Sequence, residues 1–210
     1  DRALSLMQEL RDFCWKRFVH PQISLSGGNP LLYPRFYEFY QAAADHGLSI
    51  AILGNAAPRE AIEQIMAIQR PVYYQVSLEG LKQHNDSIRG SGNFERTVTF
   101  LRMLTEMGVP NMVMLTLTSA NLEQVIPLVE LLEGITGGLT FNRLALFGEG
   151  TQLALPDRAA YRTFLEQYVA ALPTHPVLAL KDNLLNTVFD NQGQELFGGC
   201  TGFGCGAAFN

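Results

Sequence analysis

The sequence predicts an α/β fold built on a parallel sheet, because strand-like and helix-like segments alternate along most of the chain. Most of these strand–helix units recur at roughly 25 residues, which leaves room for a right-handed crossover helix between parallel strands. The strand-like segments are apolar runs, as expected for strands that are buried on both faces. The choice therefore lies between a doubly wound sheet and a partial α/β barrel.

The expected elements follow one another regularly along the chain. Strands are expected over residues 23–26, 48–53, 72–78, 112–118 and 139–147. Helices are expected over residues 3–18, 34–47, 94–107, 121–132 and 156–172, with a further helix that opens at Pro58 and a short helical piece at 184–189. The first helix places one stripe of residues inward: Met7, Leu10, Cys14 and Phe18.

Two segments depart from this regular pattern. A long polar loop is expected between residue 78 and the helix that begins at residue 94. Pro127 falls inside the helix over 121–132, so its first turn is distorted or its start lies nearer Ile126.

The most informative stretch is the end of the first strand, where Gly27 and Gly28 precede Asn29 and Pro30. Two adjacent glycines let a ligand approach the main chain, because no Cβ stands in the way. Pro30 fixes its own φ, removes one donor and holds Asn29 in an extended conformation. A plain strand-to-helix turn is the alternative interpretation of this stretch.

Glycine and polar residues end every predicted strand. They occupy positions 27–28, 54–55, 77–80, 116–119 and 148–150. In both candidate architectures ligands bind at the carboxyl ends of the strands. The sequence therefore predicts one binding site at this rim.

The composition restricts the class of protein. The formal net charge is −5 and no Lys/Arg-rich run occurs, which argues against a nucleic-acid partner. No apolar stretch is long enough to span a bilayer and no signal-peptide pattern opens the chain, so a cytoplasmic protein without a membrane partner is expected. Three cysteines are too few for a disulfide framework, and Cys14 is expected to be a small core residue.

The motifs at the strand ends resemble those of the radical S-adenosylmethionine (radical SAM) enzymes, specifically those with a C-terminal SPASM or twitch domain. The family's Gly-Gly-Glu-Pro appears as Gly27-Gly28-Asn29-Pro30, and its Ser-Leu-Asp-Gly as Ser77-Leu78-Glu79-Gly80. A family-like block over 84–90 follows, and a degenerate Thr-Asn-Gly appears as Gly54-Asn55-Ala56. The family's Asn-Arg-Leu and Gly-x-Gly appear as Asn142-Arg143-Leu144 and Gly148-Glu149-Gly150. Order and spacing match over residues 1–150.

The resemblance implies a role for each matched residue in binding S-adenosylmethionine. The backbone of Gly27, Gly28 and Asn29, with Pro30, takes the methionine amino group. Ser77 contacts the methionyl carboxylate or the ribose, and Arg89 pairs with a carboxylate, which its planar donor fork suits. Asn142, Arg143 and Leu144 border the adenine through main-chain contacts. Asn55 and Glu79 lie in the matched motifs and complete the expected set. The structural alternatives are strand-end capping for Ser77 and Asn142 and a loop salt bridge for Arg89.

The resemblance also implies a fold, a partial (β/α)6 TIM-like barrel that carries the second to sixth parallel strands and lacks the first. The family holds its catalytic [4Fe–4S] cluster with thiolates of a CxxxCxxC loop, and that motif does not occur in the sequence. We expect the missing strand and loop to precede Asp1, so that residues 1–210 alone bind no catalytic cluster and are inactive. Asn29 replaces the family's glutamate, which keeps a hydrogen-bonding group and removes a charge.

The last residues contain Cys200 and Cys205 in a glycine-rich context. They resemble the start of a SPASM or twitch segment, in which cysteines bind an auxiliary iron–sulfur cluster; a flexible loop with two free thiols is the alternative. The expected organisation is a radical SAM core over 1–150, a helical linker region over 151–197 and the start of the auxiliary segment over 198–210.

The resemblance implies an oxidoreductase that reductively cleaves S-adenosylmethionine to a 5′-deoxyadenosyl radical and modifies a peptide or protein substrate, with an electron donor as a second partner. A sulfatase-maturase-like role is the alternative within the family. Two other functions remain open: a phosphate-metabolite TIM-barrel enzyme, in which residues 148–150 bind phosphate, and a non-catalytic peptide-binding barrel. The sequence assigns no catalytic acid or base.

Overall fold

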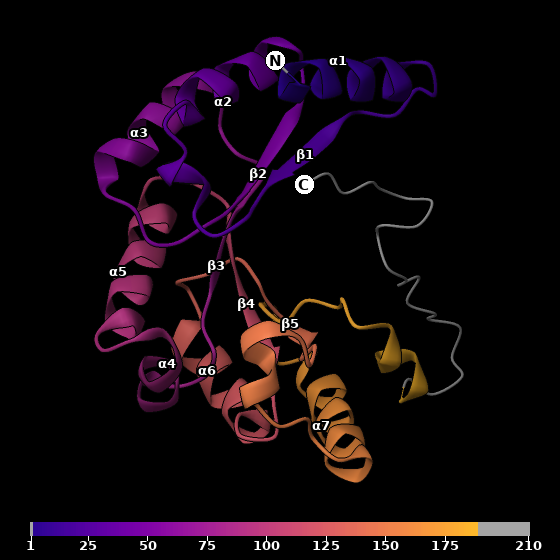
Figure 1. Cartoon of the computed structure of the whole chain (residues 1–210). Coiled ribbons are helices and arrows are strands. Elements are labelled where there is room, and N and C mark those ends of the chain that lie inside the picture. The colour runs from indigo at the N-terminus through magenta and orange to yellow at the C-terminus, as the bar shows by residue number, and fades with distance from the viewer. Residues whose placement is uncertain (1, 189–210) are drawn as a thin grey trace. The chain divides into compact units, whose positions relative to one another are not determined.

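The computed structural model describes residues 2–188 (Figure 1). Cys200, Cys205 and the expected auxiliary-cluster segment over 198–210 lie outside the described residues. Within the described part of the chain, no helix is long and apolar enough to cross a membrane.

One five-stranded sheet runs through the structure in the order β1-β2-β3-β4-β5. The strands are β1 (Gln22–Leu25), β2 (Ser49–Leu53), β3 (Tyr74–Ser77), β4 (Asn111–Leu117) and β5 (Leu139–Arg143). The pairing is parallel, with Ser24 opposite Ala51 and Ile52 opposite Tyr74. A doubly wound sheet reverses its strand order, whereas this sheet keeps the order of the sequence. The partial TIM-like barrel topology is therefore confirmed, with β1 at one edge.

Helices connect the strands. They are α1 (Arg2–Trp15), α2 (Phe36–Asp45), α3 (Arg59–Ile68), α4 (Lys82–Arg89), α5 (Asn93–Glu106), α6 (Val125–Leu132) and α7 (Arg158–Ala171). Short 3₁₀ turns are η1 (Pro30–Leu32), η2 (Leu122–Gln124), η3 (Gly148–Gln152) and η4 (Asn183–Thr187). Pro127 lies in the first turn of α6 behind η2, where the missing N–H of proline leaves no helical bond unmade.

The chain divides into two compact units. The first contains Asp1–Ser77, Ser91–Val113 and Gly134–Gly137, and the second contains Leu78–Gly90, Met114–Glu133 and Gly138–Asn210. In the first unit the buried Tyr74 ring of β3 meets Phe100 of α5 edge-on, with ring centroids 5.1 Å apart. In the second unit Phe141 of β5 packs edge-on against Phe164 and Tyr168 of α7. Each unit thus has its own aromatic core.

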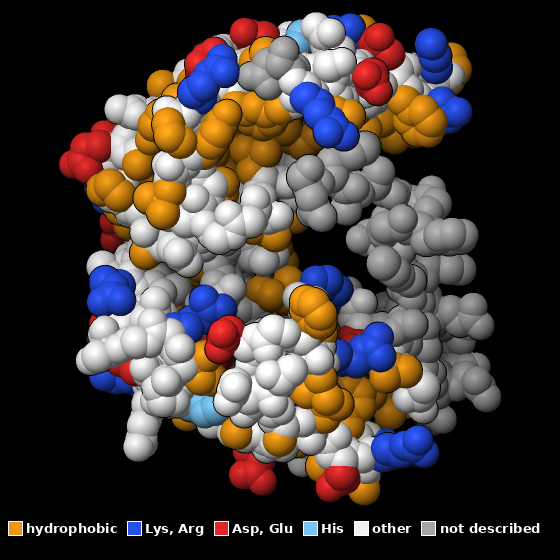
Figure 2. Space-filling view, in the orientation of Figure 1, with side chains coloured by type: hydrophobic (Ala, Val, Ile, Leu, Met, Phe, Trp, Pro, Cys, Tyr) orange, Lys and Arg blue, Asp and Glu red, His pale blue; other side chains and the backbone are white. Residues whose placement is uncertain are grey.

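The end of α1 differs from the prediction. Met7 and Cys14 are buried, but Phe18 is fully exposed and has φ = 56°. The Val19 N–H donates to Cys14 O (3.1 Å) and the Phe18 N–H donates to Trp15 O (3.1 Å). This pair of bonds is a Schellman motif with a phenylalanine at the left-handed position, where glycine is usual. Hydrophobic side chains gather at this end of α1 (Figure 2).

Phe18→Gly is expected to raise the melting temperature by about 3 °C, because glycine adopts positive φ without the steric penalty that a Cβ brings. Thermal unfolding of the two proteins measures the shift. Phe18→Ala is the matched control, since it removes the same exposed ring and keeps the Cβ. Equal melting temperatures for the two variants would show that the backbone at residue 18 is unstrained.

The polar stretch after β3 also differs from the prediction, because it forms α4 instead of a loop. The buried residue of α4 is Asn85, whose Oδ1 accepts the Glu79 N–H at 3.0 Å. A helix that buries an amide has no apolar stripe, so hydrophobic periodicity does not detect it. β5 ends at Arg143 instead of residue 147, and Phe147 is exposed.

The segment after α7 adds a short pairing to β5. The Leu139 N–H donates to Val177 O (2.6 Å) and the Ala179 N–H donates to Leu139 O (2.8 Å). The bridge between Leu139 and Leu178 is parallel. Residues 177–179 therefore run in the same direction as β5 and end on the same side of the sheet.

Candidate functional site

The end of β1 exposes main chain in the first unit. Gly27 has φ = 103° and Gly28 has φ = 70°, so both residues adopt conformations that favour glycine. A Cβ placed on either residue would meet no described atom within 4 Å. This space beside the backbone is what a ligand that binds main-chain groups requires.

Asn29 and Gly54 lie close together in the same unit. The Asn29 Oδ1 atom is buried and has no hydrogen-bond partner among the described residues. A Cβ on Gly54 would lie 3.1 Å from this atom and 2.8 Å from the Tyr74 hydroxyl oxygen. Gly54 therefore allows a close approach that no other residue permits. Sequence reasoning assigned Gly54 to the rim, but it missed the part played by Tyr74.

Tyr74 holds the next predicted residue in place. Its hydroxyl donates to Asn55 O at 2.8 Å, and burial raises the pKa of the phenol. The Asn55 side chain is exposed, and Ser77 ends β3 half-buried. The structure thus places Gly27, Gly28, Asn29, Asn55 and Ser77 at or just beyond the carboxyl ends of β1, β2 and β3. Pro30, at the start of η1, is buried behind them.

In the second unit the predicted residues Glu79 and Arg89 contact each other directly. The Arg89 Nε donates to Glu79 Oε1 at 2.9 Å, and one Nη atom donates to the same oxygen. The other carboxylate oxygen, Oε2, accepts the Thr116 N–H at 3.0 Å. Glu79 is 5% exposed. Arg89 therefore forms the salt bridge that was the structural alternative for this residue. Its guanidinium carries five N–H donors, so further donors remain beside the two that Glu79 accepts.

Amide side chains that sequence reasoning missed complete this network. The Asn121 Nδ2 donates to Glu79 O (2.9 Å) and to Thr116 O (2.9 Å), and its Oδ1 accepts the Thr118 N–H (2.8 Å). Gln124 Oε1 accepts the Leu81 N–H at 2.9 Å. An asparagine three residues beyond the strand expected over 112–118 was the signal that could have identified Asn121, because asparagine side chains satisfy backbone groups in such turns.

The residues at the end of β5 meet the segment that follows α7. Asp182, which is 7% exposed, accepts the Tyr161 hydroxyl (3.0 Å) and the Arg143 Nε (3.0 Å) on Oδ2. Burial and the neighbouring carboxylate together raise the pKa of Tyr161. Leu144 is buried, whereas the Asn142 side chain is exposed and accepts a bond from Lys181. The sequence did not single out Lys181 or Asp182.

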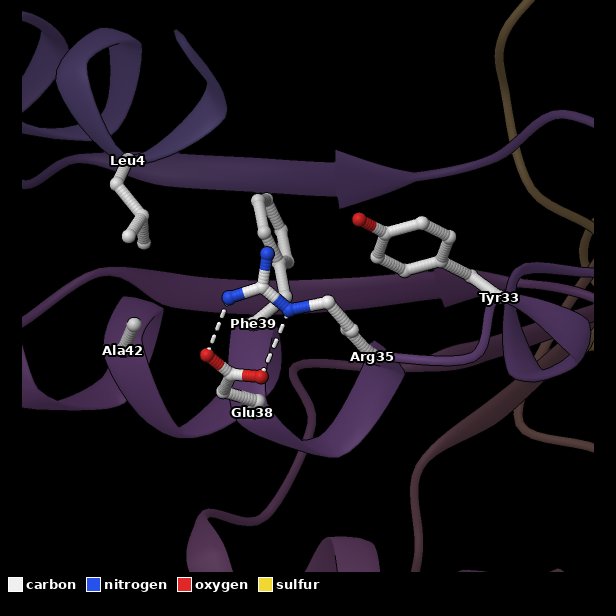
Figure 3. Close-up of a pocket in the computed structure, with 6 residues that line it drawn as sticks. All are labelled: Leu4, Tyr33, Arg35, Glu38, Phe39 and Ala42. Carbon is white, nitrogen blue, oxygen red and sulfur yellow. Dashed lines mark hydrogen bonds and ion pairs between the residues drawn. The ribbon is translucent and has the colours of Figure 1, made fainter. Parts of the chain in front are cut away.

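A shallow pocket between α1 and α2 contains none of the predicted residues (Figure 3). It is lined by Leu4, Tyr33, Arg35, Glu38, Phe39 and Ala42. Arg35 and Glu38 form an ion pair there, which raises the pKa of the first group and lowers that of the second. Both groups are exposed, so the pair contributes little to stability. This pocket is not the candidate site.

Among the described residues, no group of three or more metal-ligating side chains is close enough to hold a metal ion. Cys14 is buried and free. The expected ligands Cys200 and Cys205 lie outside the described residues and stay predictions.

Comparison with known proteins identifies the family. The model of the radical SAM superfamily matches residues 3–132, which is more than half of the chain. The chain belongs to the radical SAM superfamily. This membership removes the phosphate-metabolite alternative and agrees with the order of the motifs from Gly27 to Gly90.

Curated radical SAM relatives match part of the chain. An AdoMet-dependent heme synthase of Methanosarcina barkeri is 32% identical over 117 residues, which cover 53% of this chain and 33% of that protein. The mycofactocin maturase MftC of Mycobacterium tuberculosis is 28% identical and covers 62% of this chain and 34% of that protein. The sporulation killing factor maturation protein SkfB of Bacillus subtilis is 26% identical and covers 51% of this chain and 27% of that protein. The chain therefore spans about a third of the length of these relatives.

Solved structures share the fold. Streptococcus suis SuiB bound to S-adenosylmethionine gives a TM-score of 0.65 at 21% identity and covers 80% of this chain and 41% of that chain. anSMEcpe with bound AdoMet gives a TM-score of 0.67 at 16% identity and covers 90% of this chain and 57% of that chain. These similarities show that the shared fold extends beyond residue 132 in this chain.

Proposed function

We propose that the protein containing this chain is a radical SAM enzyme that binds S-adenosylmethionine and modifies a peptide or protein. The observation that carries the proposal is the open double glycine after β1, in a chain that belongs to the superfamily. Both glycines have positive φ, a Cβ on either would meet no described atom, and they stand in the family's cofactor motif. One-electron cleavage of the bound cofactor supplies a radical that abstracts hydrogen from the substrate.

The residues of the first unit suit the methionine amino group. A protonated amine has three donors and no acceptor, so it needs oxygen atoms. Asn29 Oδ1 is such an acceptor, because it is buried and lacks a partner among the described residues. The Asn29 carbonyl is already engaged, since it accepts the Leu32 N–H at 3.0 Å. Within this proposal the side-chain oxygen of Asn29 binds the ammonium beside the backbone of Gly27 and Gly28.

The residues of the second unit suit the rest of the cofactor. Arg89 is fixed by Glu79 and keeps N–H donors for the methionyl carboxylate, and Ser77 from the first unit serves the carboxylate or ribose. Asn142, Arg143 and Leu144 border the adenine through their main chain. Glu79 then acts by positioning Arg89. Asn55, whose carbonyl is held by Tyr74, belongs to the first-unit residues that the proposal assigns to the cofactor.

The substrate class follows from the relatives. Two of the curated relatives are maturases, and SuiB has been solved with its precursor peptide SuiA. We therefore propose a peptide or protein substrate, an electron donor as second partner, and a cytoplasmic location. A catalytic [4Fe–4S] cluster and an auxiliary cluster at Cys200 and Cys205 belong to the same proposal.

Production of 5′-deoxyadenosine tests the proposal. The full-length protein, reconstituted with iron and sulfide and reduced with dithionite, is expected to convert S-adenosylmethionine to 5′-deoxyadenosine and methionine. Residues 1–210 alone, treated in the same way, are expected to yield none, because the family's CxxxCxxC motif does not occur in them. A full-length protein that retains a CxxxCxxC motif and yet binds no S-adenosylmethionine would support the non-catalytic alternative. Product from residues 1–210 alone would refute the account of the missing loop.

A further inference from the structure

Lys181 follows a strand-like segment that extends the sheet beyond β5. Residues 177–179 pair in parallel with the start of β5, so the chain that follows them emerges on the side where β5 ends. Lys181 lies two residues beyond this segment, and Asn142 is the fourth residue of β5. Both residues belong to the second unit. The pairing therefore brings a lysine to the strand ends at which the family binds its ligands.

Within the described part of the chain, the Lys181 ammonium has few polar partners. Its Nζ donates to Asn142 Oδ1 at 2.8 Å and lies 3.9 Å from Met114 Sδ, a weak acceptor. Among the described residues, no carboxylate lies within ion-pair distance of it. The adjacent Asp182 is engaged by Arg143, by Tyr161 and by the Leu184 N–H at 2.8 Å.

Lys181 is an exposed residue, but its ammonium is partly removed from water. Partial burial lowers the pKa of Lys181, because removing an ammonium from water disfavours its charged form. The second lysine of the same unit shows the usual arrangement, since Lys82 pairs with Asp86 one turn along α4 at 3.5 Å. A partly desolvated ammonium that keeps unused donors is suited to an anionic ligand.

The neighbouring amide provides a second donor. Asn142 Oδ1 faces the ammonium, so its Nδ2 group remains a donor on the other side of the amide. An ammonium and an amide N–H beside each other match the two oxygens of a carboxylate. The main chain of Asn142 is the part assigned to the adenine, and its side chain is therefore available.

We propose that Lys181 and the side chain of Asn142 form a carboxylate-binding subsite. The inference rests on the proposed function and deepens it, because the carboxylate belongs either to the methionyl group of S-adenosylmethionine or to an acidic residue of the substrate. Both sources present the same chemistry. The variants Lys181→Gln and Lys181→Arg in the reconstituted full-length protein separate them, with Lys82→Gln as the matched control.

Calorimetric titration with S-adenosylmethionine and with decarboxylated S-adenosylmethionine tests the first source. If the subsite holds the cofactor, Lys181→Gln weakens binding of S-adenosylmethionine at least tenfold and leaves binding of the decarboxylated compound unchanged. Lys181→Arg, which keeps the charge, restores most of the affinity, and Lys82→Gln binds both compounds like the wild type.

Binding of N-acetylglutamate and N-acetylglutamine, measured with and without S-adenosylmethionine, tests the second source. If the subsite holds the substrate, the wild type prefers N-acetylglutamate, and Lys181→Gln removes this preference without changing cofactor affinity. A folded Lys181→Gln protein that matches the wild type in both measurements overturns the inference. Failure of the wild type to bind S-adenosylmethionine at all contradicts the proposed function instead. In that case the N-acetylglutamate measurement still shows whether Lys181 and Asn142 bind a carboxylate.

Discussion

Replacing Glu79 by alanine is expected to lower the free energy of unfolding by about 3 kcal/mol, which is at the lower end for breaking a buried ion pair. The change removes the carboxylate that holds Arg89 and leaves the Thr116 N–H without its acceptor. The Arg89 side chain is 30% exposed, so water replaces part of the interaction that Arg89 loses when the Glu79 carboxylate is removed. Urea denaturation followed by circular dichroism measures the difference.

Glu38→Ala is the control for this experiment. It also removes a carboxylate from an arginine, but the pair with Arg35 is exposed and its loss should leave the unfolding transition almost unchanged. The double variant Glu79→Leu/Arg89→Met should recover part of the loss, because it leaves no unpaired charge. Equal stability of Glu79→Ala and Glu38→Ala would show that the buried network contributes nothing.

Gly28→Ala is expected to weaken binding of S-adenosylmethionine to the full-length protein at least tenfold, or about 1.4 kcal/mol. A Cβ at this position would meet no described atom, so it would occupy the space assigned to the cofactor. Gly28 has φ = 70°, and alanine therefore also destabilises the backbone. Titration calorimetry measures the affinity, and thermal unfolding measures the stability.

Gly108→Ala separates these two effects. Gly108 has φ = 69° and likewise no described atom within 4 Å of a Cβ, but it ends α5 and lies outside the cofactor motifs. The two variants should therefore lose similar stability, and only Gly28→Ala should lose affinity. A Gly28→Ala protein with normal affinity, or equal losses of affinity in both variants, would remove the double glycine from the cofactor site.

The strands and their order could be predicted because they depend on local patterns. Each strand is an apolar run that ends at glycine or polar residues, and the spacing between runs requires parallel crossovers. Gly28 could be identified in the same way, since a double glycine is visible without knowledge of its neighbours. The family motifs led to the prediction that Glu79, Arg89 and Asn142 belong to the cofactor site.

The remaining features depend on contacts that are distant in sequence. Glu79 meets Thr116 across 37 positions, and Lys181 meets Asn142 across 39. The hydrophobic periodicity of a sequence cannot predict contacts between residues so far apart. α4 was missed because its buried residue is the amide of Asn85, and the helical stripe was extended wrongly to Phe18 because a Schellman turn with phenylalanine leaves no glycine signal.

The sequential order of the sheet has a consequence for synthesis on the ribosome. Each strand from β2 to β5 pairs with the strand that left the ribosome just before it. Loop closure therefore spans one crossover connection at each step, with two helices (α4 and α5) between β3 and β4, and no early strand waits for a late partner. The sheet can grow by one strand and its crossover connection at a time as the chain emerges, and at each stage its newest strand is the open edge to which the next strand adds.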